Sequence, residues 1–361
     1  MFAAIEPLAR FRRRPSCIGR MARGEPLQHN EGMTSLGLSI AIGDYDRTRA
    51  LLDGSLAIDG VDATFLPLEP EEMFFRALRH AEFDVCELSM SSYCAAVARG
   101  ASRYVAVPVF PSRAFRHTAF YVRADGGIDS IEGLRGKRVG LPEYQLTACV
   151  WARILMSEAG VEPEDVTWIR AGIEQAGRPE KTRLDLPAKV RLEDAGQGKT
   201  LSAMLVSGEI DAIVSPRAPS CFAEGDPAVR WLFADPAAAA QDYYARTRIF
   251  PIMHLLALRR DVYERHRWVP SSLLKAFTLA KDRAIRRLED NAALKVTLPF
   301  LEHDVARARR QMGDDYWSYG FAPNRGLLDL FLAGHHRQGL SARRLTPEEL
   351  FAEEALELYA V

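Results

Sequence analysis

Three ionisable side chains lie in an otherwise apolar and aromatic stretch, FPSRAFRHTAFYVR, at residues 110–123: Arg113, Arg116 and His117. A buried charge is costly unless it is paired. The planar guanidinium group suits bidentate binding of a carboxylate, and an imidazole titrates near neutral pH. The stretch therefore predicts a carboxylate site with a proton-transfer group. The alternative is an arginine bound to a helix end and a histidine satisfied by the backbone. Strand alternation would point Arg116 to the face opposite Arg113 and His117.

Glu143, Tyr144 and Thr147 form a second group of candidates, after the expected strand Arg138–Leu141 and before an expected helix. Open α/β sheets place ligand-binding groups at such positions. The N–H groups of a helix N-terminus could hold an anion there, whereas Glu143 would oppose one. Its expected role is therefore proton transfer or binding of a phenolic hydroxyl. The alternative is a solvated carboxylate in the first helical turn.

His254 lies in FPIMHLLAL, an expected strand that is apolar on both faces. A lone histidine in such a run is usually a satisfied core residue, but this one lies at the second expected chain crossover and could serve proton transfer. Four further residues in loops and turns could contact a carboxylate ligand, namely Arg217, Arg178, Tyr45 and Arg47. The adjacent histidines His335 and His336 would point about 100° apart on a helix and are expected to be solvated.

Strands and helices alternate along the chain, which predicts an α/β fold with mixed, mainly parallel sheets and helices on both faces. The first expected strand is Leu36–Ile42, and a second alternating series begins with Arg138–Leu141. The stretch Asp235–Thr247 reads as rich in loops. The chain then returns through the strand Ile252–Leu258 to a long helix, Ser271–Arg287. A second α/β unit is thus expected to be inserted within the first.

The segments DSIEGLRGKRVG and MLVSGEIDAIVSP resemble the second lobe of type II periplasmic binding proteins. The resemblance implies two lobes joined by two chain crossovers, with a ligand between them. Lobe 1 would comprise residues 34–121 and 250–361, including a C-terminal extension, and lobe 2 residues 122–249. The crossovers are expected near Tyr121 and Ile249. Residues 1–33 carry no periodic apolar pattern and are expected to be a disordered leader or an over-extended start.

Four further stretches resemble one enzyme family within that fold, 4,5-dihydroxyphthalate decarboxylase: FPSRAFRHTAFYVR, GKRVGLPEYQLTACVWAR, IFPIMHLLALRRDVYERHRWVP and DDYWSYGFAPNRGLLDLF. The resemblance implies release of CO2 from a hydroxylated aromatic dicarboxylate, with 4,5-dihydroxyphthalate giving protocatechuate. Proton transfer would fall to His117 and His254, with Glu143 third, and which histidine is the acid stays open. The retained carboxylate would be held by Arg113, Arg116 and Arg217. Tyr45, Arg47, Tyr144, Thr147 and Arg178 are further candidates for substrate contact.

Composition excludes several classes of function. The 47 basic and 48 acidic residues give a formal net charge of -1, which favours neither nucleic acid nor an anionic membrane. No apolar run reaches the roughly 18 residues that span a bilayer. The five cysteines form no C-x-x-C pair, which points to a reducing, cytoplasmic location. No dinucleotide, P-loop, G-x-S-x-G or H-E-x-x-H motif is present, so neither a cofactor nor a metal is expected.

Two alternatives remain from the sequence. A non-catalytic binding protein for an aromatic or other carboxylate would fit the same fold, although no secretory signal pattern is found. A decarboxylase of a related hydroxylated aromatic acid would share the same motifs. In each case the expected partner is a small molecule. The sequence leaves the formation of homo-oligomers open.

Overall fold

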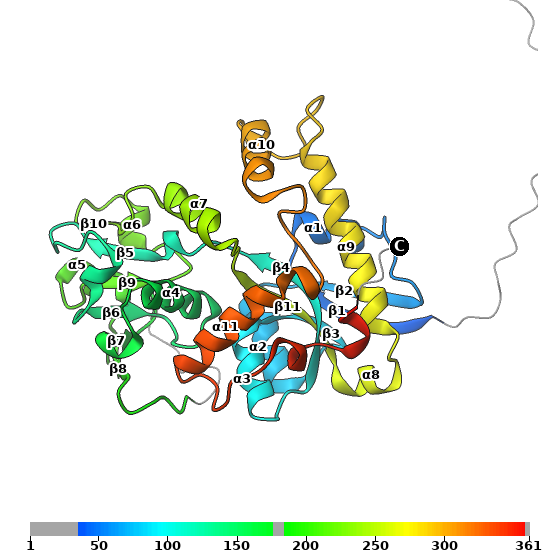
Figure 1. The fold of residues 1–361 in the computed structure, drawn as a ribbon, viewed down its shortest axis with the longest axis horizontal. Coiled ribbons are helices and arrows are strands. Elements are labelled where there is room, and N and C mark those ends of the chain that lie inside the picture. The colour runs from blue at the N-terminus through cyan, green and yellow to red at the C-terminus, as the bar shows by residue number, and fades with distance from the viewer. Residues whose placement is uncertain (1–34, 176–183, 358–361) are drawn as a thin grey trace, which may run out of the picture. The chain divides into compact units, whose positions relative to one another are not determined.

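The computed structural model describes residues 35–175 and 184–357. The expected leader, residues 1–33, and the candidate Arg178 lie outside the described residues. The strands form two mixed sheets (Figure 1). The first has the order β2-β1-β3-β11-β4, with β1 Leu36–Ile42, β2 Val61–Pro67, β3 Val85–Ser89, β4 Tyr104–Arg113 and β11 Ile252–Arg259. The second has the order β10-β5-β9-β6-β7-β8, with β5 Phe120–Arg123, β6 Arg138–Leu141, β7 Thr167–Arg170, β8 Arg191–Asp194, β9 Ala212–Val214 and β10 Val229–Trp231.

Each sheet combines a parallel part with an antiparallel part. In the first sheet β1 pairs parallel with β2 and β3, whereas β11 runs antiparallel to β3 and β4. In the second sheet β6, β7, β8 and β9 pair in parallel, and β5 runs antiparallel to β9 and β10. Because β11 follows the second unit in the chain and returns to the first sheet, the second sheet is inserted within the first unit. The expected α/β architecture is therefore confirmed.

The helices connect the strands and continue beyond the last one. The described helices are α1 Asp46–Leu52, α2 Pro70–His80, α3 Met90–Ala98, α4 Thr147–Glu158, α5 Leu201–Ser207, α6 Ser220–Ala223, α7 Pro236–Thr247, α8 Arg260–Arg265, α9 Val269–Leu288, α10 Leu301–Met312 and α11 Arg325–Arg337, with a short 3-10 turn η1 at His117–Ala119. The strands β1 and β6 have the bounds expected from the sequence, and α9 differs from its expected bounds by two residues at its start and one at its end.

Three details differ from the sequence-based expectations. The stretch expected to be rich in loops is helix α7: Asp235 caps it by accepting a hydrogen bond from the backbone N–H of Ala238, and Pro236 occupies its first turn. Strand β5, which begins at Phe120, already belongs to the second sheet, so the chain leaves the first sheet between Arg113 and Phe120, a few residues before the crossover expected near Tyr121. His335 is fully buried rather than solvated, whereas His336 is exposed.

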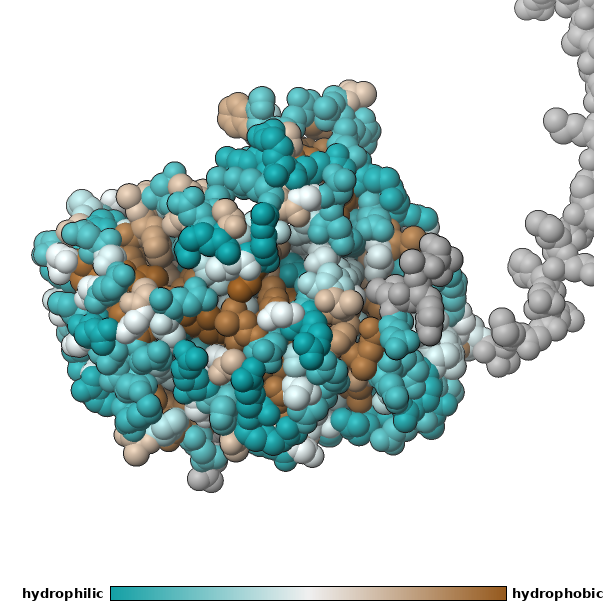
Figure 2. Space-filling model, in the orientation of Figure 1, coloured by the Kyte–Doolittle hydropathy of each residue, from teal (hydrophilic) through white to brown (hydrophobic). Residues whose placement is uncertain are grey.

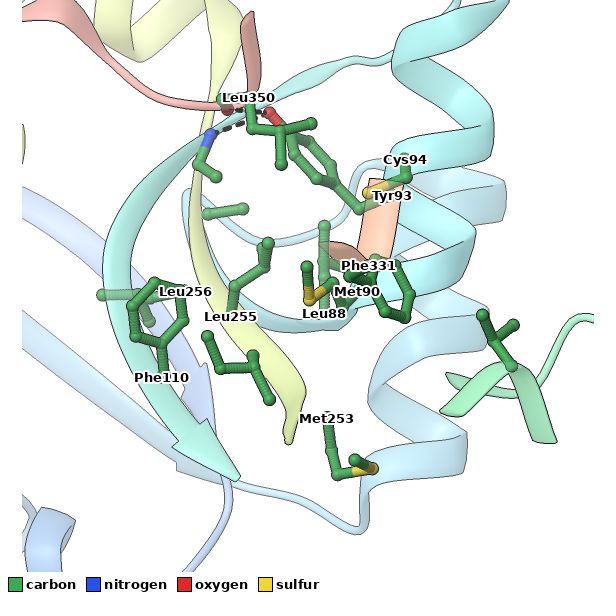
Figure 3. Close-up of a cluster of buried hydrophobic side chains, with 14 of the residues drawn as sticks. Leu88, Met90, Tyr93, Cys94, Phe110, Met253, Leu255, Leu256, Phe331 and Leu350 are labelled. Atoms are coloured by element: carbon green, nitrogen blue, oxygen red, sulfur yellow. Dashed lines mark hydrogen bonds between the residues drawn. The ribbon is translucent and has the colours of Figure 1, made fainter. Parts of the chain in front are cut away.

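The core around the first sheet also holds the C-terminal segment. Figure 3 shows buried side chains of β3, β4, β11 and α3 packed together, among them Leu88, Met90, Phe110 and Leu255. The hydroxyl of Tyr93 donates to the carbonyl of Leu350 at 2.5 Å and accepts from the amide of Ala106 at 3.0 Å. Since Ala106 lies in β4 and Leu350 near the C-terminus, this one phenol joins the sheet to the end of the chain.

Helix α4 of the second unit is attached directly to the first sheet. The indole N–H of Trp151 donates to the carbonyl of Ile252 in β11 at 2.8 Å, and Thr147 Oγ1 accepts from the backbone N–H of Ser91 at 3.1 Å. The ring of Trp151 also packs against Phe331 of α11, with centroids 5.2 Å apart. These contacts fix the N-terminal end of α4 near β3 and β11, and β11 contains the candidate His254.

His335 supports the same joint from α11. Its Nε2 lies 3.1 Å from Ser91 Oγ and its Nδ1 lies 3.2 Å from Ser341 Oγ. Burial lowers the pKa of His335 to about 3, so the ring is neutral at physiological pH and can both donate and accept a hydrogen bond. Helical periodicity does not reveal these partners, because Ser91 lies 244 positions away and Ser341 follows the end of α11.

We predict that Gly334→Ala destabilises the protein by about 1–3 kcal/mol, the usual cost of overpacking. A Cβ at Gly334 would lie 2.6 Å from Ile154 Cγ1 of α4, closer than two carbon atoms can approach. Gly326→Ala, on the same helix, is the matched control, because its Cβ would have no neighbour within 4 Å. That control should leave stability unchanged or raise it by up to about 1 kcal/mol through helix propensity. Urea unfolding measures both, and equal midpoints for the two variants would contradict the close approach of α11 to α4.

Candidate active site

A buried carboxylate in the middle of β3 organises the candidate site. Glu87 has no exposed surface, and its Oε1 accepts from the hydroxyl of Tyr45 at 2.9 Å and contacts Nδ1 of His254 at 2.5 Å. Its Oε2 accepts from the backbone N–H of Gly43 at 3.2 Å. A buried charge is retained only where several donors compensate for lost hydration. The three donors come from the β1–α1 turn and from β11, so the carboxylate joins three neighbouring strands at one end of the sheet.

His254 is positioned by this carboxylate and by its strand. It pairs with Ser89 of β3 on one side and with Ser112 of β4 on the other, and the register of β11 shifts on both sides of it. Its ring meets the edge of Phe74 at 4.8 Å, and 19% of its side chain is exposed. Because Nδ1 faces the carboxylate, Nδ1 carries a hydrogen and Nε2 is left for a substrate. Such an imidazole can transfer a proton through Nε2.

Tyr45 and Arg47 border the same carboxylate from the start of α1. Burial and the charge of Glu87 raise the pKa of Tyr45, so its phenol stays protonated and donates. The guanidinium carbon of Arg47 lies 4.2 Å from the ring centre of Tyr45 and 4.4 Å from that of Trp317. Its Nε donates to the carbonyl of Pro111 at 2.5 Å. Arg47 is therefore held between two aromatic rings beside the site.

The second unit reaches the site through the start of α4. Thr147 Oγ1 lies 3.0 Å from Ser89 Oγ, and Ser89 is the strand neighbour of His254. Glu143 is buried in the turn before α4. Tyr144 is fully buried too, but it faces away from this cluster: its hydroxyl donates to the carbonyl of Gln338 at 3.3 Å, and Arg153 covers its ring at 3.8 Å. Thr147 therefore borders the site, whereas Tyr144 packs beneath it.

Arg116 is a half-buried cation without an acidic partner in the described part of the chain. Its Nε lies 3.1 Å from Sδ of Met253, the residue before His254. Burial lowers the pKa of Arg116 to about 10, which reflects the cost of holding its charge away from water. A guanidinium in such a place is stabilised when an anion binds. Arg116 is therefore the arginine best suited to hold a carboxylate beside His254.

Two other candidates, His117 and Arg217, lie away from the Glu87 cluster. His117 is packed among the rings of Phe115, Phe233 and Tyr243, and burial lowers its pKa to about 4. Its ring is a neutral group packed among aromatic side chains, and its Nδ1 has no hydrogen-bond partner among the described residues, so its expected role in proton transfer stays a prediction. Arg217 is an exposed side chain, 69% accessible, whose Nη2 lies 3.7 Å from Glu71 Oε1. Neither residue contacts the Glu87 cluster.

Arg113 is only 6% exposed, and neutral oxygens take its hydrogen bonds. It donates to the carbonyls of Phe250 at 2.8 Å and Ser318 at 2.7 Å, and to Asn324 Oδ1 at 2.5 Å. These bonds fasten the second crossover and the C-terminal segment to the end of β4. Arg113 therefore has structural partners on three sides, and its expected role as a carboxylate anchor stays a prediction.

Glu87 was missed from the sequence. The available signal was a carboxylate within FDVCELS, a short strand whose other residues read as buried, because an acid there must be compensated by donors from other segments. Its partners Tyr45 and His254 lie 42 and 167 positions away, so spacing along the chain could not join them. Both partners were nevertheless among the sequence candidates.

Comparisons with known proteins bear on this site. A family model described as the phosphonate ABC transporter periplasmic substrate-binding protein matches residues 44–185. A 4,5-dihydroxyphthalate decarboxylase of Comamonas testosteroni is 54% identical over 330 residues, which cover 91% of this chain and all of that protein. The chain belongs to the 4,5-dihydroxyphthalate decarboxylase family. A second decarboxylase of this name, from Pseudomonas putida, is 57% identical over 213 residues, 59% of this chain and 83% of that protein.

The decarboxylase family shares its fold with solute-binding proteins. A periplasmic sulfonate-binding protein of Methylobacillus flagellatus KT superposes with a TM-score of 0.51 at 13% identity, over 88% of this chain and 91% of that one. At this identity the likeness concerns the fold alone, and it confirms the two-lobed α/β architecture. The division into lobes at residues 121 and 249 stays a prediction, which the sheet membership of β5 and β11 supports with a slightly earlier first crossover.

Three further features of the described residues concern metal ligands, membrane-spanning helices and cysteines. Within residues 35–175 and 184–357, no three His, Cys, Asp or Glu side chains are placed together so that they could bind a metal ion. In the same part of the chain, no helix is both long and apolar enough to cross a membrane. Four cysteines, Cys86, Cys94, Cys149 and Cys221, are buried free thiols. Burial raises the pKa of Cys86 and Cys94 above the usual range, so neither serves as a nucleophile at neutral pH.

Proposed function

We propose that this protein is a cytoplasmic decarboxylase that converts 4,5-dihydroxyphthalate to protocatechuate and CO2, with His254 as its proton-transfer residue. The observation that carries the proposal is the contact between His254 Nδ1 and the buried Glu87, which leaves Nε2 available to a substrate. The relatives that share most of this chain bear the name of that activity. An imidazole oriented by a buried carboxylate is an arrangement suited to proton transfer.

The substrate can supply its own electron flow. A hydroxyl para to the departing carboxylate feeds electrons into the ring as a base accepts its proton, and His254 donates a proton from Nε2 to the carbon that bears the carboxylate. The carbon–carbon bond then breaks, CO2 leaves, and its bonding electron pair restores the aromatic ring. The phenolate recovers its proton from the base, and His254 is reprotonated from solvent. One proton is consumed for each CO2 released.

Other residues have supporting roles in this proposal. Glu143, in the turn before α4, is the proposed base for the phenolic hydroxyl, and Thr147 is a proposed hydrogen-bonding partner of the substrate. Arg116 holds the retained carboxylate, since it is a half-buried cation without an acidic partner in the described residues. Glu87 does not touch the substrate. It orients the imidazole of His254 by accepting a hydrogen bond from Nδ1.

The purified protein should release CO2 from 4,5-dihydroxyphthalate and form protocatechuate in equal amounts, and it should do so after exhaustive treatment with a chelator. Headspace CO2 and liquid chromatography of the products measure this. Activity that is lost with the chelator and restored by one divalent ion would contradict the expected independence from metals. Tight binding without CO2 release would favour the binding-protein alternative. Turnover of a different hydroxylated aromatic acid, with none of 4,5-dihydroxyphthalate, would change the substrate but not the reaction.

A further inference from the structure

A hollow of about 550 Å³ lies beside the two chain crossovers, apart from the Glu87 cluster. It is lined by the end of α7, the second crossover, the segment after α10 and the start of α11. Figure 2 shows a depression with a hydrophilic rim on the viewed face between α7 and α10. Binding sites for small molecules commonly have volumes of roughly 300–1,000 Å³ and often lie between domains. The hollow has the size and the place of a ligand site.

The charge in this hollow is positive. Arg113 lies in its wall, and neutral oxygens take the hydrogen bonds of its guanidinium group. Arg248 lines it too and donates only to the carbonyl of Gln311, at 3.2 Å. The acid in the lining, Asp315, is bound by the ammonium group of Lys281 at 2.5 Å. Two cations therefore line the hollow, neither forms an ion pair with a described carboxylate, and the one acid beside them, Asp315, is shared with Lys281.

The backbone at Arg248 supports a functional reason for this cation. Arg248 caps α7 in the left-handed conformation, with a φ of 59°. A residue with a side chain is disfavoured there by about 1–2 kcal/mol, and glycine usually takes such positions at helix ends. A cation that favours the helix dipole is already present in the last turn at Arg246. The sequence thus retains an arginine where glycine would be more stable.

Three aromatic rings also contribute to the lining. Tyr244, Phe250 and Tyr316 border the hollow, and Phe250 is stacked on Phe115 with centroids 4.7 Å apart. Flat rings beside guanidinium groups suit a ligand that is both aromatic and anionic. The segment between the hollow and the Glu87 cluster is short: Ser318 lines the hollow, while the preceding Trp317 packs on Arg47. The two sites are therefore separate but share one wall.

We propose that this hollow is a second binding site for a small aromatic carboxylate, distinct from the site at His254. The test is a calorimetric titration of the full chain with phthalate, which has both carboxylates but no hydroxyl to drive decarboxylation. We expect two bound molecules per chain. Arg248→Gly should weaken one of the two binding events about tenfold or more, because it removes a charge-assisted contact. Glycine is the appropriate replacement, since it accepts the left-handed backbone.

Two further variants make the test specific. Met312→Trp should fill the hollow and abolish the same binding event, while Arg310→Ala, a neighbouring exposed arginine outside the lining, should leave both events unchanged. CO2 release without phthalate should be the same in Arg248→Gly as in the original protein, so failure of the proposed function is seen separately. A single binding event, or two events that Arg248→Gly and Met312→Trp both leave intact, would overturn the proposal. Equal affinity for inorganic phosphate at the Arg248-dependent site would overturn its aromatic part.

Discussion

His254→Ala is expected to lower kcat for CO2 release by about 100-fold to 10,000-fold while KM changes by no more than a few-fold, the range typical for removal of a positioned acid or base. The reason is geometric. Glu87 holds Nδ1 at 2.5 Å and thereby fixes the direction of Nε2, and no other described histidine contacts this carboxylate. The protonation of the ring carbon would then depend on water. Steady-state kinetics with 4,5-dihydroxyphthalate as substrate measure both constants.

Two additional variants separate catalysis from structure. Added imidazole should restore part of the activity of His254→Ala in a saturable manner, because the free base can occupy the space of the lost ring. His254→Asn should fold like the original protein, since its amide N–H can replace Nδ1 beside Glu87, yet it should be as inactive as the alanine variant. An alanine at the exposed His303 serves as the control and should have normal kinetics. Full activity of His254→Asn would show that His254 is not the proton donor.

Glu87→Gln provides an independent measure of the positioning role. The amide can still accept from Tyr45, but it lacks the negative charge that makes the hydrogen bond from Nδ1 of His254 a charge-assisted one and so holds the ring in place. We expect a lower kcat with little change in KM, and no rescue by imidazole, because the ring of His254 is still present. A rise in KM alone would indicate that Glu87 shapes the binding surface instead of acting through His254.

The candidate residues could be found from the sequence because their types are unusual in their surroundings, but their roles could not. A histidine in an apolar segment can either contact a polar partner at a site or pack as a core residue, and both arrangements occur here. His254 meets a carboxylate and stays partly exposed, whereas His117 meets three aromatic rings and is buried. The difference depends on residues of other segments, Glu87 in one case and Phe233 and Tyr243 in the other. Local pattern carries no information about such partners.

The fold was predictable to a greater extent, since strands and helices leave periodic signals. β1 and β6 matched their expected bounds, as short apolar runs between turn residues should. Helix α7 was missed although Asp235 and Pro236 form a good start signal, because its sequence PAAAAQDYYART has few large apolar residues to show a period. The burial of His335 was missed for another reason: the face of α11 that packs on α4 is set by a partner distant in sequence.

The roles of the two arginines in the first candidate stretch depend on their hydrogen-bond partners, which the sequence does not reveal. Arg113 and Arg116 lie three residues apart and both were candidates for a carboxylate anchor. Arg113 donates hydrogen bonds to two backbone carbonyls and one amide oxygen. Arg116 contacts a thioether and no acid among the described residues. A buried or half-buried cation without an anion is the arrangement that ligand binding can improve. These contacts make Arg116 the stronger candidate for the anchor role, and the role expected for Arg113 stays a prediction.

Arg116→Ala is accordingly expected to lower kcat/KM by about one to two orders of magnitude, mainly through KM, because a charge-assisted hydrogen bond contributes roughly 1.5–3 kcal/mol. Arg116→Lys should recover only part of the loss, since a point charge cannot form the two parallel bonds of a guanidinium fork. Arg217→Ala is the matched control: its side chain is 69% exposed and solvent screens its charge, so its kinetics should stay within a few-fold of the original. Removal of a half-buried cation without an anion should not destabilise the free protein, and thermal unfolding without substrate verifies this. If Arg217→Ala raised KM and Arg116→Ala did not, the carboxylate would be held at the exposed rim, and the placement of the substrate beside Met253 and His254 would be wrong.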